Sequence, residues 1–447
     1  MKLRILLSAY ACEPNRGSEP GVGWNVAREA ARENEVWVLT RGNNRPAIEA
    51  AGEADPNLHF IYYDLPGWAR FWKRGQRGIR TYYYLWQAGA LRVARQWHER
   101  IGFHLVHHVT FVNYWMPSFL AALPAPFLWG PVGGGESLPP GFWSWLGPRA
   151  RAYEWLRMAL RQRGEMDPFV RSAARRSGVA LATTEQTAHR LRGLGCRDVR
   201  VQSEAGLSDE DVRSLAAMPP PDGKWLRLIS LGRLVNWKGF ELGVRAFAEF
   251  ARGDSRSEYW IVGDGPELGP LQRLATELGV GDRVKFFGGQ PRDEALRLLG
   301  RCDALVHPSL HDSGGWVCLE AMAAGRPVVC LDWGGPGLQV DGETGIKIVP
   351  ITPGQVVLEL SQAFGYLAAA PALRRRMGEA GRRRADEEFR WVRKGLILRR
   401  LYRELVRRVP GAGSIEVGAP ASVEAGPLAG EAGHGGAIDG WLAKGAD

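Results

Sequence analysis

Short apolar runs alternate along the chain with longer stretches in which apolar residues recur every three or four positions. The short runs predict buried parallel strands, and the longer stretches predict helices. In the first half of the chain the predicted strands are 3–8, 35–40, 57–64, 104–110, 127–132, 179–183 and 199–203. Such alternation indicates a parallel sheet with helices on both faces.

A proline-rich segment at 218–224 separates this series from a second one. The second series predicts strands at 226–231, 259–262, 284–287, 304–307 and 327–331. We therefore expect an α/β protein with two tandem, doubly wound, Rossmann-like domains, 1–215 and 222–385. Their strands should end at a shared central cleft, which is where ligands bind in open α/β sheets.

The pattern changes again toward the C-terminus. Residues 369–409 are expected to be helical, and 391–409 is the amphipathic part. From 410 to 447 glycine, alanine, proline and serine dominate, which predicts a disordered tail. The stretch 114–135 is uncharged but contains four prolines. It predicts a buried helix followed by a strand, and not a membrane span.

Charge and cysteine content narrow the class of protein. The five cysteines are scattered and form no C-x-x-C pair, and no apolar signal-peptide core follows the first residues. We expect a reduced, cytoplasmic protein without a metal site. The formal net charge of +10 favours phosphates, acidic lipids or nucleic acid as partners, but it says nothing about the fold.

Two acids, Asp312 and Glu320, stand on either side of the small turn 313–315, and a helical pattern begins at Trp316. A helix N-terminus behind glycines offers N–H groups and a positive dipole end to a phosphate. Because carboxylates repel phosphate, we expect the acids to accept hydrogen bonds from hydroxyl groups on either side of a diphosphate. The alternative is an ordinary strand–loop–helix corner with a capping acid.

Other candidate residues follow predicted strand ends. Arg233 and Lys238 are spaced to converge on a diphosphate, or else are surface charges at a helix start. The turn 263–266 allows close backbone approach, or is a plain turn. The loop 17–23 matches a dinucleotide-binding loop only loosely, because its glycines have the wrong spacing. Of His107 and His108, one is expected in the core and the other could face the cleft.

Over residues 225–350 these motifs resemble those of family 4 retaining glycosyltransferases of GT-B fold. The matching sequence is Gly-Arg-Leu-x-x-x-Lys-Gly, Gly-Asp-Gly-Pro, acid-x7-Glu, Asp332-Trp-Gly-Gly-Pro-Gly and Asp341-Gly-Glu-Thr-Gly345. The resemblance implies two domains facing a cleft, with the helix 391–409 crossing back to the first. Two departures are Asp312, where the family usually has glutamate, and 204–207, which replaces the usual Asn-Gly-Val-Asp.

The resemblance also implies residue roles. Arg233 and Lys238 would bind the donor diphosphate, Glu320 the nucleotide ribose, and Asp312 the hydroxyls of the donor sugar. The other positions that it implies are the phosphate-binding turn (Ser313, Gly314, Gly315 and Trp316), the border of the base (Gly263, Asp264 and Gly265), and the sugar and acceptor side (His108 and Gly21).

The implied reaction transfers a sugar from a nucleotide-sugar, UDP- or GDP-linked, with retention at the anomeric carbon. The acceptor would be a glycan or a lipid-linked molecule, in cell-surface polysaccharide or glycolipid synthesis. No metal, no cofactor besides the donor and no nucleic acid are expected. A nucleotide-sugar epimerase or hydrolase of the same fold is the alternative. A nucleic-acid-binding protein would explain the charge but not the acid pair.

The segment 68–86 interleaves basic and aromatic residues. Such a mixture suits the headgroup layer of an anionic membrane, so one expectation is peripheral docking at the inner membrane face. The other expectation is that 82–86 begins a packed helix and that the arginines before it are merely solvated.

Overall fold

The computed structural model describes residues 2–408, except 53–54, 70–71, 74–77 and 222–224. The tail 410–447, which the composition predicts to be disordered, lies outside the described residues, as do Arg70, Phe71, Arg74 and Arg77 of the proposed docking segment.

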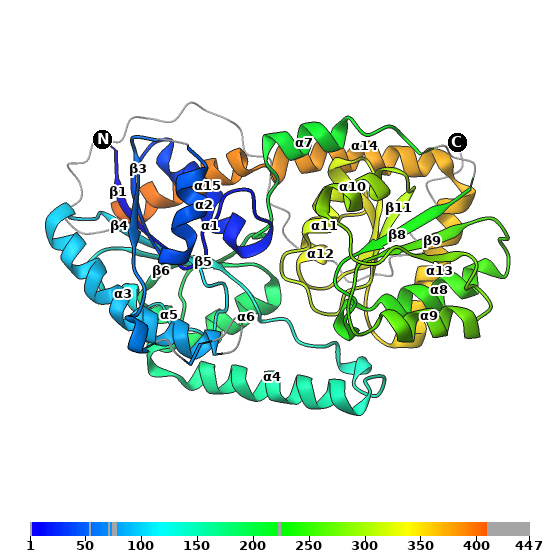
Figure 1. The fold of residues 1–447 in the computed structure, drawn as a ribbon, viewed down its shortest axis with the longest axis horizontal. Coiled ribbons are helices and arrows are strands. Elements are labelled where there is room, and N and C mark those ends of the chain that lie inside the picture. Colours follow the sequence, from blue (N-terminus) through cyan, green and yellow to red (C-terminus); the bar gives the residue numbers. More distant parts are fainter. Residues whose placement is uncertain (1, 53–54, 70–71, 74–77, 222–224, 409–447) are drawn as a thin grey trace.

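The first domain is built on a seven-stranded parallel sheet with the order β3-β2-β1-β4-β5-β6-β7 (Figure 1). Its strands are β1 (Arg4–Ala9), β2 (Glu35–Thr40), β3 (Leu58–Tyr62), β4 (Leu105–Thr110), β5 (Phe127–Val132), β6 (Ser177–Ala182) and β7 (Val199–Val201). Side chains on alternate positions enter different cores, with Leu6 on one face of the sheet and Ile5 and Leu7 on the other. Both faces are therefore covered, as the apolar runs predict.

The second domain has a six-stranded sheet with the order β10-β9-β8-β11-β12-β13, also parallel. Its strands are β8 (Arg227–Leu231), β9 (Glu258–Val262), β10 (Val284–Phe286), β11 (Ala304–His307), β12 (Val328–Leu331) and β13 (Gly345–Ile348). Strand β13 was not predicted. It follows the turn at 341–344 and contains Lys347, so it lacks a continuous apolar run.

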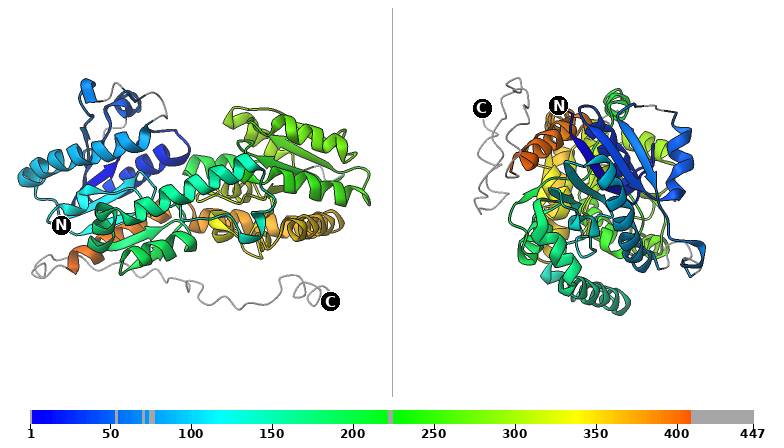
Figure 2. Two further views of the ribbon diagram at one scale, coloured as in Figure 1. Left: turned by 90° about the horizontal axis from the view of Figure 1, so that it is seen from below. Right: turned by 90° about the vertical axis from the view of Figure 1, so that its left-hand side faces the viewer.

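Helices cover both faces of each sheet (Figures 1 and 2). In the first domain they are α1 (Ser18–Ala31), α2 (Arg45–Ala50), α3 (Ile79–Ile101), α5 (Pro168–Arg176) and α6 (Glu185–Leu194). Between the domains and in the second one they are α7 (Asp209–Ala216), α8 (Phe240–Ala251), α9 (Leu268–Glu277), α10 (Arg292–Gly300), α11 (Trp316–Ala323), α12 (Gly334–Gln339), α13 (Pro353–Ala369) and α14 (Pro371–Glu388). The acidic start of α7 is a capping box, in which the side chains of Ser208 and Asp211 bond to each other's backbone N–H groups.

The C-terminal helix crosses back to the first domain. Helix α15 (Trp391–Arg407) places Leu398, Leu401 and Tyr402 in the core formed with α1 and β1. The region 369–409 is not one helix, however. It breaks at Phe389 and Arg390, because the backbone there pairs with Leu207 in the linker between the two domains. The crossing itself is confirmed (Figure 1).

A second connection between the domains was not predicted. After β5 the chain leaves the first domain, and Leu138 and Phe142 enter the core of the second. The chain then returns through the long helix α4 (Pro148–Met166), which lies along both domains (Figures 1 and 2). We call residues 136–166 the strap. The indole N–H of Trp333 donates to the Ser137 carbonyl over 3.0 Å and fixes its first part.

One expectation for the first domain is wrong, and the C-terminal part of the proposed docking segment is buried. Residues 114–126 contain only a short 3-10 turn, Phe119–Ala122, and no α-helix, because Pro117 and Pro124 bracket it. In the segment 68–86, the side chains of Tyr82, Tyr83 and Trp86 are fully buried in the core and cannot face a membrane. Here the packed-helix expectation is correct, since they lie in α3.

Within the described residues, no single helix is both long and apolar enough to cross a bilayer. Only α13 and α14 taken together have the required length and composition, and they meet at a bend of 103°.

Candidate active site

The turn between β11 and α11 is organised by Asp312. One carboxylate oxygen, Oδ1, accepts hydrogen bonds from the N–H groups of Gly315 (3.0 Å) and Gly314 (3.3 Å). The two glycine N–H groups that the sequence assigned to phosphate are thus held by Asp312. By helix geometry, Trp316 and Val317 in the first turn of α11 have no carbonyl one turn earlier to bond. Their N–H groups point out of the start of the helix, an arrangement that suits an anion.

The other oxygen of Asp312, Oδ2, joins two further side chains. It contacts Nζ of Lys238 at 2.5 Å and Nε2 of His307 at 2.9 Å. Burial opposes ionisation of Asp312, but the charge of Lys238 and the His307 hydrogen bond outweigh it and hold its pKa well below the usual range. Burial lowers the pKa of His307, so its ring is neutral and donates from Nε2. Asp312 therefore fixes Lys238 at the head of the cleft.

Glu320 lies inside α11 and is held by a neighbouring arginine. Arg292, at the start of α10, donates to its Oε1 from Nη2 at 2.8 Å and from Nε at 3.1 Å. The same guanidinium contacts Asp211 of α7 at 2.9 Å. Burial raises the pKa of Glu320, and Arg292 partly offsets this rise. The structure thus pairs Glu320 with a cation that also contacts Asp211.

Arg233 is exposed at the cleft and lies over the ring of Trp237, 5.8 Å from its centroid. The Trp237 ring also stacks on Tyr153 of α4, with centroids 5.4 Å apart and planes 8° apart. Below this stack, His311 contacts Arg157 (3.1 Å) and Glu154 (3.3 Å), both from α4. The strap therefore touches both loops that carry the candidate diphosphate-binding residues.

Close packing of two loops explains why positions 263 and 265 are glycines. Gly263 and Gly265 both have positive φ, and a Cβ on either would overlap a backbone carbonyl of the Arg233 loop, at Gly232 or Leu234. The two loops are hydrogen-bonded, with Leu234 N–H donating to Asp264 O at 2.9 Å. The turn thus lies directly beside the loop of Arg233.

On the first domain, His108 is fully buried in β4, and its Nε2 bonds to Phe111 O at 3.1 Å. Burial lowers its pKa to about 4, and Nδ1 has no partner among the described residues. His107 is equally buried, with its ring nitrogens bonded to the Tyr402 hydroxyl and to Gly130 O, so neither histidine is exposed. Gly21 lies in the first turn of α1, where a Cβ would overlap Arg16 O.

Three acids that the sequence reasoning did not assign also belong to this region. Glu204 accepts a 2.9 Å bond from Ser313, and Thr184 donates to Glu136 at 2.6 Å. Burial, together with the nearby charges of Glu19, Glu136 and Asp312, raises the pKa of Glu204 to about 7. These three acids could not be recognised from the sequence, because their hydrogen bonds join segments that lie far apart in the chain. The described residues hold no grouping of three or more His, Cys, Asp or Glu suited to a metal ion.

Glu19 gives a prediction for stability. Burial raises its pKa from 4.5 to about 7, against a hydrogen bond from Val112 N–H at 2.8 Å. Between these two pH values the folded protein keeps a proton that the unfolded chain has lost, so stability falls as the pH rises through this window. In Glu19→Gln, the free energy of unfolding should fall less from pH 4.5 to 7.5, by about 2 kcal/mol. Urea denaturation across this range tests it, with Glu13→Gln from the same loop as the control. Parallel curves for wild type and Glu19→Gln would contradict it.

Residues 217–384 match the model of the family described as Glycosyl transferases group 1. This match covers the second domain. Over 182 residues the chain is 36% identical to a GDP-mannose-dependent alpha-(1-6)-phosphatidylinositol monomannoside mannosyltransferase of Mycolicibacterium smegmatis, covering 39% of this chain and 47% of that protein. Over 234 residues it is 30% identical to a 2-deoxystreptamine glucosyltransferase of Streptomyces kanamyceticus, covering 49% and 58%. The chain spans about half the length of the curated relatives it matches.

Solved structures show the fold over nearly the whole chain. Sucrose-phosphate synthase of Thermosynechococcus elongatus superposes with a TM-score of 0.62 at 22% identity, covering 91% of this chain and all of that one. Anabaena Alr3699/HepE in complex with UDP superposes with a TM-score of 0.58 at 18% identity, covering 90% and 100%. With the two parallel sheets, these likenesses confirm the GT-B fold.

Proposed function

We propose that the protein is a retaining glycosyltransferase that moves a sugar from a nucleotide-sugar to a glycan or lipid-linked acceptor. The observation that carries the proposal is the Lys238–Asp312 pair at the start of α11, within a group 1 domain and facing the first domain of a GT-B fold. Relatives named for mannosyl and glucosyl transfer support this activity.

The chemistry follows from where charge develops. When the bond between sugar and diphosphate breaks, negative charge grows on the departing phosphate. Lys238, Arg233 and the first turn of α11 are placed to stabilise that charge. A phosphate oxygen of the leaving group takes the acceptor proton, and the sugar keeps its anomeric configuration. These protein cations supply the positive charge, so the proposed reaction needs no metal.

The donor and acceptor are proposed by class. A UDP- or GDP-linked sugar fits the diphosphate site, and Glu320 would hold its ribose. Two matched relatives are named for phosphatidylinositol monomannoside mannosyl transfer and lipopolysaccharide core biosynthesis, which favours a lipid-linked or glycan acceptor. We propose that the protein meets such an acceptor in the cytoplasm, at the inner face of the membrane. Trp68, which is 80% exposed, is the most exposed of the described aromatic residues of 68–86 and would be available for contact there.

A panel of nucleotide-sugars and nucleoside diphosphates in a thermal-shift assay tests the donor. Since a ligand stabilises by RT ln(1 + [L]/Kd), one member should raise the melting temperature more than its free sugar does. NMR analysis of the glycoside product then reads its anomeric configuration. Inverted product would refute retention. Products formed without any acceptor would favour the epimerase or hydrolase alternative.

Asp312→Asn tests the organising acid. The change removes the charge that holds Lys238, so we expect a loss of about 2 kcal/mol in the free energy of unfolding. Transfer should fall by roughly tenfold or more, because Lys238 loses its fixed position. Asp332→Asn is the matched control, since Asp332 forms a more exposed pair with Lys347 at 2.9 Å. Equal stability and rate in the two variants would show that Asp312 does not hold the site together.

A further inference from the structure

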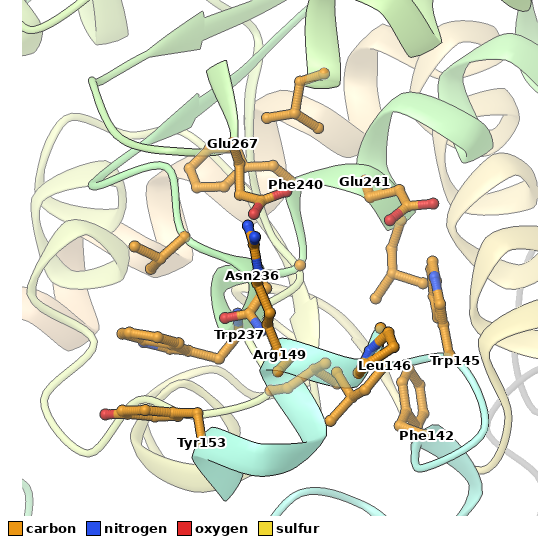
Figure 3. Close-up of a pocket in the computed structure, with 18 residues that line it drawn as sticks. Phe142, Trp145, Leu146, Arg149, Tyr153, Asn236, Trp237, Phe240, Glu241 and Glu267 are labelled. Carbon is orange, nitrogen blue, oxygen red and sulfur yellow. The ribbon is translucent and has the colours of Figure 1, made fainter. Parts of the chain in front are cut away.

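A pocket of about 670 Å³ lies between the strap and the segment that carries Lys238. One wall comes from residues 142–153 of the strap, and the other from residues 235–242 together with Glu267 and Leu271 (Figure 3). Arg233, Lys238, Asp312 and Glu320 are not among its lining residues. The pocket is therefore lined by residues other than those of the proposed diphosphate site.

Aromatic rings form opposite sides of this pocket. Trp237 and Tyr153 stack on one side, and Phe142 and Trp145 stack at 6.0 Å on the other (Figure 3). Phe240 contributes to the lining between them. Phe142 is fully buried, but Trp145 and Tyr153 are partly exposed, and exposed flat rings pack well against the C–H faces of sugar rings, which are apolar although their edges carry hydroxyls. The volume lies within the range of ordinary small-ligand sites.

Polar groups project between these rings. Glu267, Glu241 and Asn236 come from the second domain, and Arg149 comes from the strap (Figure 3). Burial, with the nearby charge of Glu241, raises the pKa of Glu267. Carboxylates and an amide accept hydrogen bonds from hydroxyls, while the guanidinium donates to hydroxyl or ring oxygens. An acyl chain would leave these groups without partners, and a phosphate would be repelled by two carboxylates.

We propose that this pocket binds a neutral oligosaccharide, at a site separate from the donor cleft. Rings for the C–H faces and acceptors for the hydroxyls occur together, and one wall belongs to the strap while the other belongs to the second domain. A bound saccharide would therefore bridge the strap and the second domain. It would also touch Trp237, whose ring lies under Arg233. The proposal concerns binding alone and does not depend on transfer.

The test measures binding without a donor. Maltohexaose, cellohexaose and an α-(1→6)-linked mannohexaose are titrated into the full-length protein by calorimetry and by saturation-transfer NMR. At least one should bind with a dissociation constant of about a millimolar or tighter. Adding saturating UDP or GDP should leave the constant unchanged. No binding of any of the three, or displacement by the nucleotides, would overturn the proposal. Because no turnover is measured, such a failure is distinct from failure of the transferase proposal.

Two variants locate the bound saccharide. Trp145→Ala removes a ring, and Glu267→Gln removes a charged acceptor while keeping its shape. Each should weaken binding by about tenfold or more. Trp155→Ala is the control, since Trp155 is also in the strap, on α4, but is 68% exposed and does not line the pocket. Melting temperatures show whether each variant is folded, and if Trp145→Ala is not, Glu267→Gln decides. Unchanged binding in the folded pocket variants would refute the site.

Discussion

Replacing Lys238 by methionine should lower the rate of sugar transfer by roughly 100- to 1000-fold, the usual loss when one preorganised charge-stabilising group is removed. Methionine keeps the length and apolar stem of lysine but cannot donate to a phosphate. The amine is fixed at 2.5 Å from Asp312 and is therefore in position before the donor arrives. Because the charge it meets grows during bond cleavage, the loss should appear mainly in kcat and less in KM.

Two comparisons separate this effect from damage to the fold. Lys285→Met changes an exposed lysine on β10 and should leave the rate unchanged. Circular dichroism and urea denaturation should show that Lys238→Met is folded, since Asp312 keeps bonds from His307, Gly314 and Gly315. If folded Lys238→Met transfers sugar within threefold of wild type, the diphosphate assignment is wrong.

Strands could be predicted from the sequence where nearly every residue of the strand is buried. Strands 35–40, 127–132 and 304–307 agree with β2, β5 and β11 because both faces of a parallel sheet are covered and the whole run is apolar. Strand β13 contains a glycine and a lysine, as turns often do, so its sequence does not distinguish it from a turn.

The strap could not be predicted for a different reason. Its anchor, Phe142, is buried by the domain that follows later in the chain, so no local pattern shows what it contacts. Helix α4 contains five arginines and exposes Trp155, Leu156 and Leu160, which blurs the apolar stripe by which helices are recognised. The pocket beneath the strap depends on this connection.

The candidate site, like the fold, could be predicted only in part from the sequence. The spacing of Asp312 and Glu320 and the glycine turn between them were visible as a local motif. The partners of the two acids were not, because Lys238 and Arg292 come from other elements of the second domain. Asp312 therefore emerges as the residue that positions Lys238 and the turn, a function that the sequence did not distinguish from binding a sugar hydroxyl.

Glu320→Gln should weaken binding of the nucleotide-sugar donor by about 10- to 100-fold, the range expected when a charge-assisted hydrogen bond of 1.5–3 kcal/mol is lost. Glutamine keeps the size of the side chain and one acceptor oxygen, but it loses the negative charge that a ribose hydroxyl would meet. Arg292 still has Asp211 at 2.9 Å, so the interface of α7 and α10 should stay intact.

Donors that lack one ribose hydroxyl make the test specific. If Glu320 accepts from the 2′- or 3′-hydroxyl, removing that hydroxyl should weaken binding to wild type but hardly affect Glu320→Gln. The two losses then fail to add, which is the signature of a direct contact in a double-mutant cycle. Asp211→Asn removes the other partner of Arg292 and should not show this coupling to the ribose. If the losses in Glu320→Gln and in the deoxy donors add fully, Glu320 acts through Arg292 on the structure and does not hold the ribose.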